Sequence, residues 1–285
     1  PEQQLLHLTD EWSSLLPIFR DVKPRSWLEF FSLLSGQKLP RLVVFDEFPY
    51  WVSADAALAS RFQKWIDHDL PRLKTLVVVS GSSQSMLDSH FLKQGAPLYG
   101  RASFHLRLQP MSYQWFCRAM GYRAQDPVSF TRFALVGGVP HYWKLMPGGS
   151  VIRQADELFF SSSAMLAEEP AQWLRDEGVS GHISKAALDL IGRGVRKPNE
   201  LASRLGTPQG NLSRPLNLLL DLGLAQRELP FGESSRSTKK VLYSIQAPAL
   251  AFYYGIFLPQ RAGWENLGRN EKMRFLELHA SRHWE

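Results

Sequence analysis

The sequence predicts an α/β fold in its first part and a small α+β domain farther along the chain. Two short apolar runs, LVVF at 42–45 and LKTLVVVS at 73–80, are rich in β-branched residues and flank a segment of helical periodicity. Such runs are typical of strands in a parallel sheet that is covered on both faces. Beyond residue 181, helical patterns give way to two β-like runs, which is the order of an α+β domain.

The segment between the two apolar runs predicts a βαβ unit. Its apolar residues recur at helical spacing; they are Ala57, Leu58, Phe62, Trp65 and Ile66. In an open α/β sheet, binding sites lie at the carboxyl ends of the strands. Residues that directly follow each run are therefore the candidates for chemistry.

Two acids, Asp46 and Glu47, directly follow the first run, and SGSSQS follows the second. One interpretation is a nucleotide hydrolase site, where Asp46 holds Mg²⁺ directly or through a water and Glu47 orients and deprotonates the attacking water. Ser82 or Ser83 would then contact the γ-phosphate or that water. The alternative is structural, because an Asp-Glu pair after a strand also suits the start of a helix.

Four stretches in this order resemble the archaeal-type ATPase family, which are P-loop ATPases of the AAA-like and STAND-like group. They are LVVFDEFPYW, LVVVSGSSQSML, PLYGRASFHLRLQPMSY and ALVGGVPHYW. The resemblance covers roughly residues 5–285. It implies a Walker B strand ending at Asp46 and Glu47, a sensor strand before Ser82 and Ser83, a helical lid, and ATP with Mg²⁺ as cofactors.

The sequence departs from the family in one respect. The family carries a G-x-x-x-x-G-K-[ST] loop that holds the phosphates through backbone amides and a lysine. No Gly-Lys dipeptide occurs in these 285 residues, and SGQKLP at 35–40 is no substitute. Either the loop lies before Pro1 or it has been lost, and the short spacing to the Walker B strand favours the first. We expect no saturable micromolar ATP binding by this chain alone.

Arg101 precedes an alternating segment in which Phe104, Leu106 and Leu108 would share one face of a strand. As an arginine finger, Arg101 would stabilise negative charge on the γ-phosphate. Alternatively, it would pair with a carboxylate at the edge of the sheet.

The resulting domain prediction has four parts. Residues 1–110 form the C-terminal portion of the ATPase core, and residues 111–180 form an aromatic-rich helical lid in which Gly-Gly-x-Pro at 137–140 ends a helix. Residues 181–247 form a winged helix-turn-helix. Residues 248–285 begin a further domain that, in the family, is likened to PD-(D/E)xK nucleases. His279 and His283 are spaced as in zinc-binding helices but lack a further ligand pair.

The winged-helix prediction rests on three helical patterns followed by the runs LAQREL and KKVLYSI. In that fold, the third helix enters the major groove and its first residues contact base edges. The candidate DNA-binding residues are Gln209, Asn211, Ser213 and Arg214 on this helix, and Arg236, Lys239 and Lys240 on the wing. Pro215 would kink a helix that began at Pro208, whereas a start at Asn211 avoids most of that cost.

Charge supports a nucleic-acid partner. Residues 180–246 hold ten Lys/Arg against five Asp/Glu, or +5 of the chain's net +6. The alternatives are a solvated surface, or a winged helix that binds protein or packs on the ATPase core. A protein partner or self-association through the ATPase core is a further expectation. The single cysteine, Cys117, fits the cytoplasm and a packing role. No apolar run is long enough for a membrane span.

Two functions follow. The first is an ATP-hydrolysing AAA-like ATPase coupled to a winged helix that binds double-stranded DNA, present here as a truncated segment. The second is a non-hydrolysing DNA-binding or protein-interaction module with a degenerate ATPase remnant.

Overall fold

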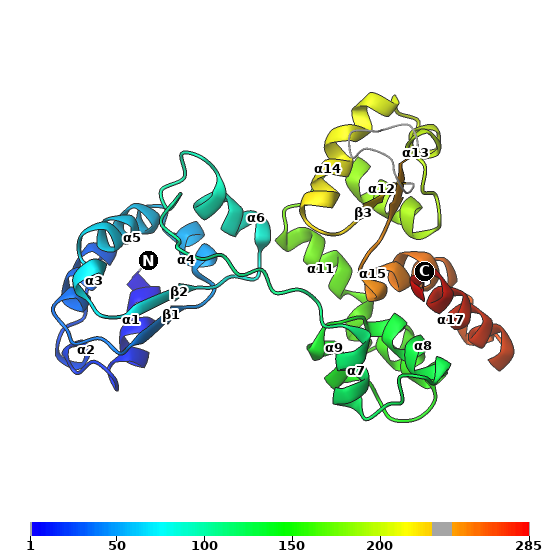
Figure 1. Ribbon diagram of the computed structural model, residues 1–285, viewed down its shortest axis with the longest axis horizontal. Coiled ribbons are helices and arrows are strands. Elements are labelled where there is room, and N and C mark those ends of the chain that lie inside the picture. Colours follow the sequence, from blue (N-terminus) through cyan, green and yellow to red (C-terminus); the bar gives the residue numbers. More distant parts are fainter. Residues whose placement is uncertain (1, 230–240, 285) are drawn as a thin grey trace. The chain divides into compact units, whose positions relative to one another are not determined.

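The chain forms two compact units, residues 1–106 and 107–285, in the computed structural model, which describes residues 2–229 and 241–284 (Figure 1). Each unit has its own hydrophobic core. No helix among the described residues is long and apolar enough to cross a membrane.

The first unit is a small parallel sheet with helices. In chain order its elements are α1 (Glu2–Trp12), α2 (Ile18–Asp21), α3 (Trp27–Ser35), β1 (Leu42–Phe45), α4 (Phe48–Ala54), α5 (Ala57–His68), β2 (Leu76–Val79) and α6 (Gln84–Leu87), with a 3-10 turn at Leu70–Arg72 and a π turn at Asp88–Leu92. Strands β1 and β2 pair in parallel, from Leu42 with Leu76 to Phe45 with Val79. This confirms the predicted βαβ unit.

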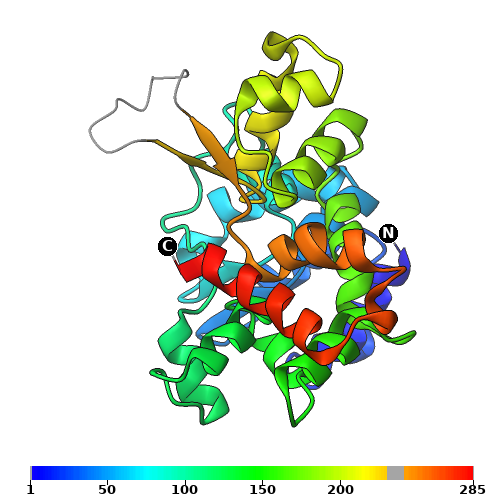
Figure 2. The same ribbon diagram turned by 90° about the vertical axis from the view of Figure 1, so that its right-hand side faces the viewer.

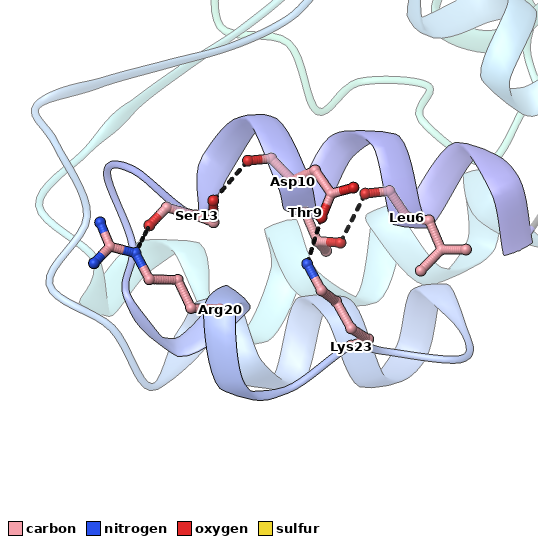
Figure 3. Close-up of polar contacts among 6 residues, drawn as sticks. All are labelled: Leu6, Thr9, Asp10, Ser13, Arg20 and Lys23. Carbon is pink, nitrogen blue, oxygen red and sulfur yellow. Dashed lines mark hydrogen bonds and ion pairs between the residues drawn. The ribbon is translucent and has the colours of Figure 1, made fainter.

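Hydrogen bonds and an ion pair connect α1 to the α2 segment that follows it (Figure 3). Lys23 reaches back to Asp10 of α1 with 2.5 Å between Nζ and Oδ1. Arg20 of α2 donates from Nε to the carbonyl of Ser13, at 2.9 Å. Thr9, which is fully buried, donates its hydroxyl to the carbonyl of Leu6 at 3.0 Å. The turn between α1 and α3 is therefore held by polar contacts while the apolar sides of the helices face the core.

The expectation that both faces of the sheet are covered is wrong for the described residues. Val43 and Phe45 point into the core, where the Phe45 ring lies 5.3 Å from the ring of Phe62 on α5. The side chains that alternate with them are between 38% and 62% exposed; they are Leu42, Val44, Leu76 and Val78. Helices of this unit cover one face, and four large aliphatic side chains remain on the other.

The expected strand around Phe104, Leu106 and Leu108 is also absent from the described structure. These three side chains are 71% to 84% exposed, and residues 101–112 have no regular secondary structure. The described residues of the first unit form a sheet of two strands, β1 and β2, and the segment pairs with neither. An alternating pattern becomes a strand only where a neighbouring strand accepts its backbone hydrogen bonds.

The second unit is mostly helical. Its elements are α7 (Tyr113–Met120), α8 (Pro127–Val136), α9 (Pro140–Leu145), α10 (Val151–Ala155), α11 (Glu169–Asp176), α12 (His182–Gly192), α13 (Pro198–Arg204), α14 (Ser213–Asp221), β3 (Gln226–Glu228), β4 (Leu242–Ser244), α15 (Pro248–Phe252), α16 (Leu258–Gln260) and α17 (Arg269–Trp284). As expected, α8 ends at Gly137, which has a φ of +63°, and Pro140 opens α9. Cys117 is buried in α7.

Residues 182–244 fold as three helices followed by a two-stranded antiparallel ladder, with β3 and β4 side by side (Figure 2). Pro198 occupies the first turn of α13, as the sequence predicts. A 3-10 turn at Gln209–Leu212 precedes α14, so Pro215 is the third residue of that helix. Its missing N–H falls among the donors that a helix start leaves unpaired, so the kink predicted for a helix that began at Pro208 has no cause here.

The chain after β4 packs back on the helical segment. Helix α17 contacts α8 and α10, and α15 also contacts α8. His279 of α17 is fully buried, and its Nε2 lies 2.6 Å from the carbonyl oxygen of Ala134 on α8. This histidine therefore joins two helices that are 145 residues apart in sequence.

Candidate functional site

The two acids at the end of β1 occupy a tight turn into α4. Asp46 is exposed, and its Oδ1 accepts a hydrogen bond from the backbone N–H of Glu47 at 3.1 Å. Glu47 has a φ of +50° and a ψ of +33°, and among the described residues it alone, apart from glycines, has a positive φ. Because this left-handed conformation is costly for a side-chain-bearing residue, the turn is held by its surroundings.

Serines at the end of β2 supply that support. Ser80 donates its hydroxyl to Asp46 Oδ1 at 2.5 Å. The Glu47 Oε2 accepts two hydrogen bonds from Ser82, one from the backbone N–H and one from the hydroxyl, each at 3.1 Å. The sequence thus brings together two acids and two serines that lie about one βαβ unit apart, as the carboxyl-end rule predicts.

The backbones of the two turns are also locked together. The N–H of Phe48, the first residue of α4, donates to the carbonyl of Ser80 at 3.1 Å. A Cβ added at Gly81 would lie 2.8 Å from the ring of Pro49, so this position accepts glycine and little else. The Asp46–Glu47 turn and the Ser80–Ser82 turn therefore hold each other in position.

The two candidate serines differ in their surroundings. Ser82 is exposed and bonded to Glu47. Ser83 is 2% exposed, and its hydroxyl contacts the hydroxyl of Ser85 and accepts from the N–H of Met86 in α6. A ligand that approached the acids would meet Ser82 first.

Arg101 lies in an ion pair within the first unit. Its Nε and Nη2 each lie 2.8 Å from a different carboxylate oxygen of Asp67 on α5, and its Nη1 donates to the carbonyls of Pro97 and Tyr99. The hydrogen bond from Arg101 lowers the pKa of Asp67. Of the two interpretations of Arg101, the structure contains the carboxylate pair, with Asp67 as a partner that the sequence did not indicate.

The oxygen ligands in this turn fit a hard divalent cation. Mg²⁺ in nucleotide sites is commonly bound by one or two protein oxygens, with water and phosphate oxygens completing the octahedron. Asp46 is exposed, its Oδ2 accepts no hydrogen bond from the described residues, and the Ser80 hydroxyl is bonded to its other carboxylate oxygen, Oδ1. Among the described residues, no group of three or more His, Cys, Asp or Glu could hold a metal by itself. Asp46 would therefore hold the ion together with its substrate.

Comparison with solved structures identifies the architecture. The Walker-type ATPase PABY2304 of Pyrococcus abyssi superposes with a TM-score of 0.60 over 87% of this chain and 75% of that one, at 18% sequence identity. The chain has an ATPase-like fold. No protein-family model matches the sequence.

A sequence relative extends farther than this chain does. The protein MJECL04 of Methanocaldococcus jannaschii, described as uncharacterized, is 26% identical over 245 residues. The match covers 84% of this chain and 53% of that protein, so the chain spans about half the length of this curated relative.

A second candidate surface lies on the three-helix part of the second unit. Four predicted DNA contacts, Gln209, Asn211, Ser213 and Arg214, are all exposed at the start of α14 and in the turn before it. The three candidates on the wing, Arg236, Lys239 and Lys240, lie outside the described residues.

Part of the basic charge in this region is paired within the protein. Three cations form ion pairs with neighbouring carboxylates: Arg193 with Asp189, Arg196 with Glu228, and Lys197 with Glu200. By contrast, Lys185, Arg204 and Arg214 form no ion pair with the described residues. The charge that is available to an anionic partner is therefore smaller than the sequence count suggests.

Proposed function

We propose that this chain is part of an ATP-hydrolysing protein in which Asp46 and Glu47 serve the metal and the attacking water. The observation that carries the proposal is the mutual support of these acids and the Ser80–Ser82 turn at the carboxyl ends of adjacent parallel strands. In a fold like that of a Walker-type ATPase, this edge of the sheet is where a nucleotide would bind.

Each residue would have one task. Asp46 would hold Mg²⁺ directly or through a water, and the ion would supply charge neutralisation at the phosphates. Glu47 would accept a proton from the attacking water, and Ser82 would fix the direction of the Glu47 carboxylate through its two hydrogen bonds. To act as an arginine finger, Arg101 would first have to break its ion pair with Asp67.

The phosphate-binding loop would come from polypeptide outside residues 1–285. Two features support this: the uncovered apolar face of Leu42, Val44, Leu76 and Val78 on the first unit, and the unpaired alternating segment at 103–108. A further strand and helix would bury the first and pair the second. Apolar area of this kind contributes about 25 cal/mol per Å² when it is covered.

The test compares two proteins. On residues 1–285, a calorimetric titration with Mg·ATP is expected to give no saturable micromolar binding. If the natural gene product carries a G-x-x-x-x-G-K-[ST] loop, Glu47→Gln in that protein is expected to retain ATP and lower turnover by at least about 10²-fold. The matched control is Glu11→Gln, at an exposed position of α1. Undiminished turnover in Glu47→Gln would remove Glu47 from its role.

We further propose that residues 181–247 are a winged helix-turn-helix that binds double-stranded DNA. The order of three helices and an antiparallel ladder supports it, as do the exposed side chains at the start of α14. In that geometry Arg214 would contact guanine or phosphate, and Asn211 or Gln209 would contact adenine.

A mobility shift of residues 1–285 on duplex DNA tests this at 50 and 200 mM salt. Arg214→Ala is expected to weaken binding about tenfold or more, because one good base contact contributes about 1–3 kcal/mol. Arg153→Ala is the control, since this exposed arginine lies on α10, away from α14, and pairs with Glu157 four residues later. If no duplex binds at the lower salt concentration, a protein-interaction role is favoured, consistent with the internally paired Arg193, Arg196 and Lys197.

A further inference from the structure

The second unit contains a cavity of about 300 Å³ whose lining combines apolar walls with two guanidinium groups. It lies among α8, the start of α10 and the start of α17. The walls are Val128, Val151, Ile152 and Met273, and the cations are Arg132 and Arg269. Neither the acids at the end of β1 nor the start of α14 contributes to it.

Arg132 is held in a fixed position from three sides. Its Nε donates to Oε1 of Gln154 at 3.2 Å, its Nη2 donates to the carbonyl of Gly149 at 3.3 Å, and its guanidinium lies 4.6 Å from the centre of the Tyr122 ring. Gln154 is fully buried and is itself anchored through Nε2 to the carbonyl of Pro147 at 2.9 Å. All these contacts are neutral, so the arginine is oriented without its charge being balanced.

Neither arginine of this cavity forms an ion pair with the described residues. Glu271, in the first turn of α17, is not among the lining residues, and its Oε2 accepts from the N–H of Gly268 at 2.9 Å. Arg132 is half-buried and Arg269 is exposed, and both line the cavity, so they present unbalanced positive charge to it. Guanidinium groups match the geometry of carboxylate and phosphate oxygens and bind them through paired hydrogen bonds.

We propose that this cavity binds a small molecule that carries a carboxylate or phosphate group on a compact apolar body. The oxyanion would lie between Arg132 and Arg269, with Asn270 as a further donor at the rim, and the apolar body would contact Val128, Ile152 and Met273. The volume is at the lower end of the range for small-molecule sites, which sets the size of the ligand. This site is independent of ATP hydrolysis and would stand if that proposal failed.

The test is a titration of residues 1–285 with phenyl phosphate and with benzoate, followed by NMR shifts or calorimetry. We expect saturable binding of one or both probes. Benzyl alcohol lacks the anion and inorganic phosphate lacks the apolar body, so each should bind at least about tenfold more weakly. Comparing the two anionic probes distinguishes a phosphate site from a carboxylate site. Failure of both to bind, or equal binding of inorganic phosphate, would overturn the proposal.

Two variants separate the site from the rest of the protein. Arg269→Gln changes an exposed first residue of α17 and is expected to weaken the better probe about tenfold without lowering the melting temperature. Met273→Trp should fill the cavity and weaken the same probe. Arg118→Gln is the control, because this exposed arginine lies over Trp115 on α7 and away from the cavity lining. Unchanged affinity in Arg269→Gln would refute the assignment.

Discussion

The left-handed backbone of Glu47 yields a prediction whose sign is unusual. At most positions glycine is less stable than alanine by about 0.5–1 kcal/mol, because it loses more freedom on folding. At a φ of +50° the order reverses, since alanine keeps a steric cost of about 1–2 kcal/mol that glycine does not have. Both substitutions remove the two hydrogen bonds from Ser82, each contributing about 0.5–1.5 kcal/mol. The difference between them therefore isolates the backbone.

We expect Glu47→Ala to lower the stability of the first unit by about 1–3 kcal/mol, because two hydrogen bonds are lost, and we expect the Glu47→Gly protein to be about 1 kcal/mol more stable than the Glu47→Ala protein. Hydrogen exchange measured by mass spectrometry on peptides that contain β1 and β2 reports this unit separately from the other. Lys64 is exposed in the middle of α5, and Lys64→Ala and Lys64→Gly form the control pair. Here the glycine variant should be less stable than the alanine variant. Equal protection in Glu47→Ala and Glu47→Gly would mean that the turn stores no strain.

Two further predictions concern stability. Burial lowers the pKa of His279 to about 3, so its neutral form is favoured in the folded state. The stability that the neutral His279 contributes is fully present above pH 6.5 and is lost as the pH falls towards 3, by up to about 1.4 kcal/mol per pH unit. In urea unfolding, the free energy of unfolding of His279→Gln should therefore depend less on pH. His7→Gln, at an exposed position, should show the same pH dependence as the parent protein. Gly81→Ala should cost about 1–3 kcal/mol by thermal unfolding, because its Cβ would meet Pro49, while Gly210→Ala meets no atom within 4 Å and should cost little. A melting temperature that Gly81→Ala leaves unchanged would contradict the clash.

Local sequence patterns were sufficient to predict those helices and strands that are determined by neighbouring residues. Strands β1 and β2, the start of α13 at Pro198 and the end of α8 at Gly137 all follow from apolar runs and from proline and glycine chemistry. The approach of Asp46 and Glu47 to the serines after β2 also followed, because parallel strands place their carboxyl ends at one edge.

The structural features that the sequence did not predict depend on contacts between residues that are distant along the chain. Whether the face of Val44 is covered depends on a second layer, which an apolar run does not specify. The segment around Leu106 has the pattern of a strand, but pairing is a property of two segments. The pairing of Arg101 with Asp67, 34 positions earlier, and the left-handed φ of Glu47 have no local sequence signature. Each is decided by tertiary contacts.

The uncovered sheet face has a practical consequence for anyone who produces these residues. Leu42, Val44, Leu76 and Val78 form an exposed aliphatic surface on a two-stranded sheet, whose outer backbone groups offer a template for strand addition by another molecule. We expect concentration-dependent association and binding of the dye ANS, both reduced by Leu76→Lys. Chaperones recognise exposed aliphatic surfaces of this kind, so in the cell the same surface would favour chaperone binding for as long as it stays uncovered.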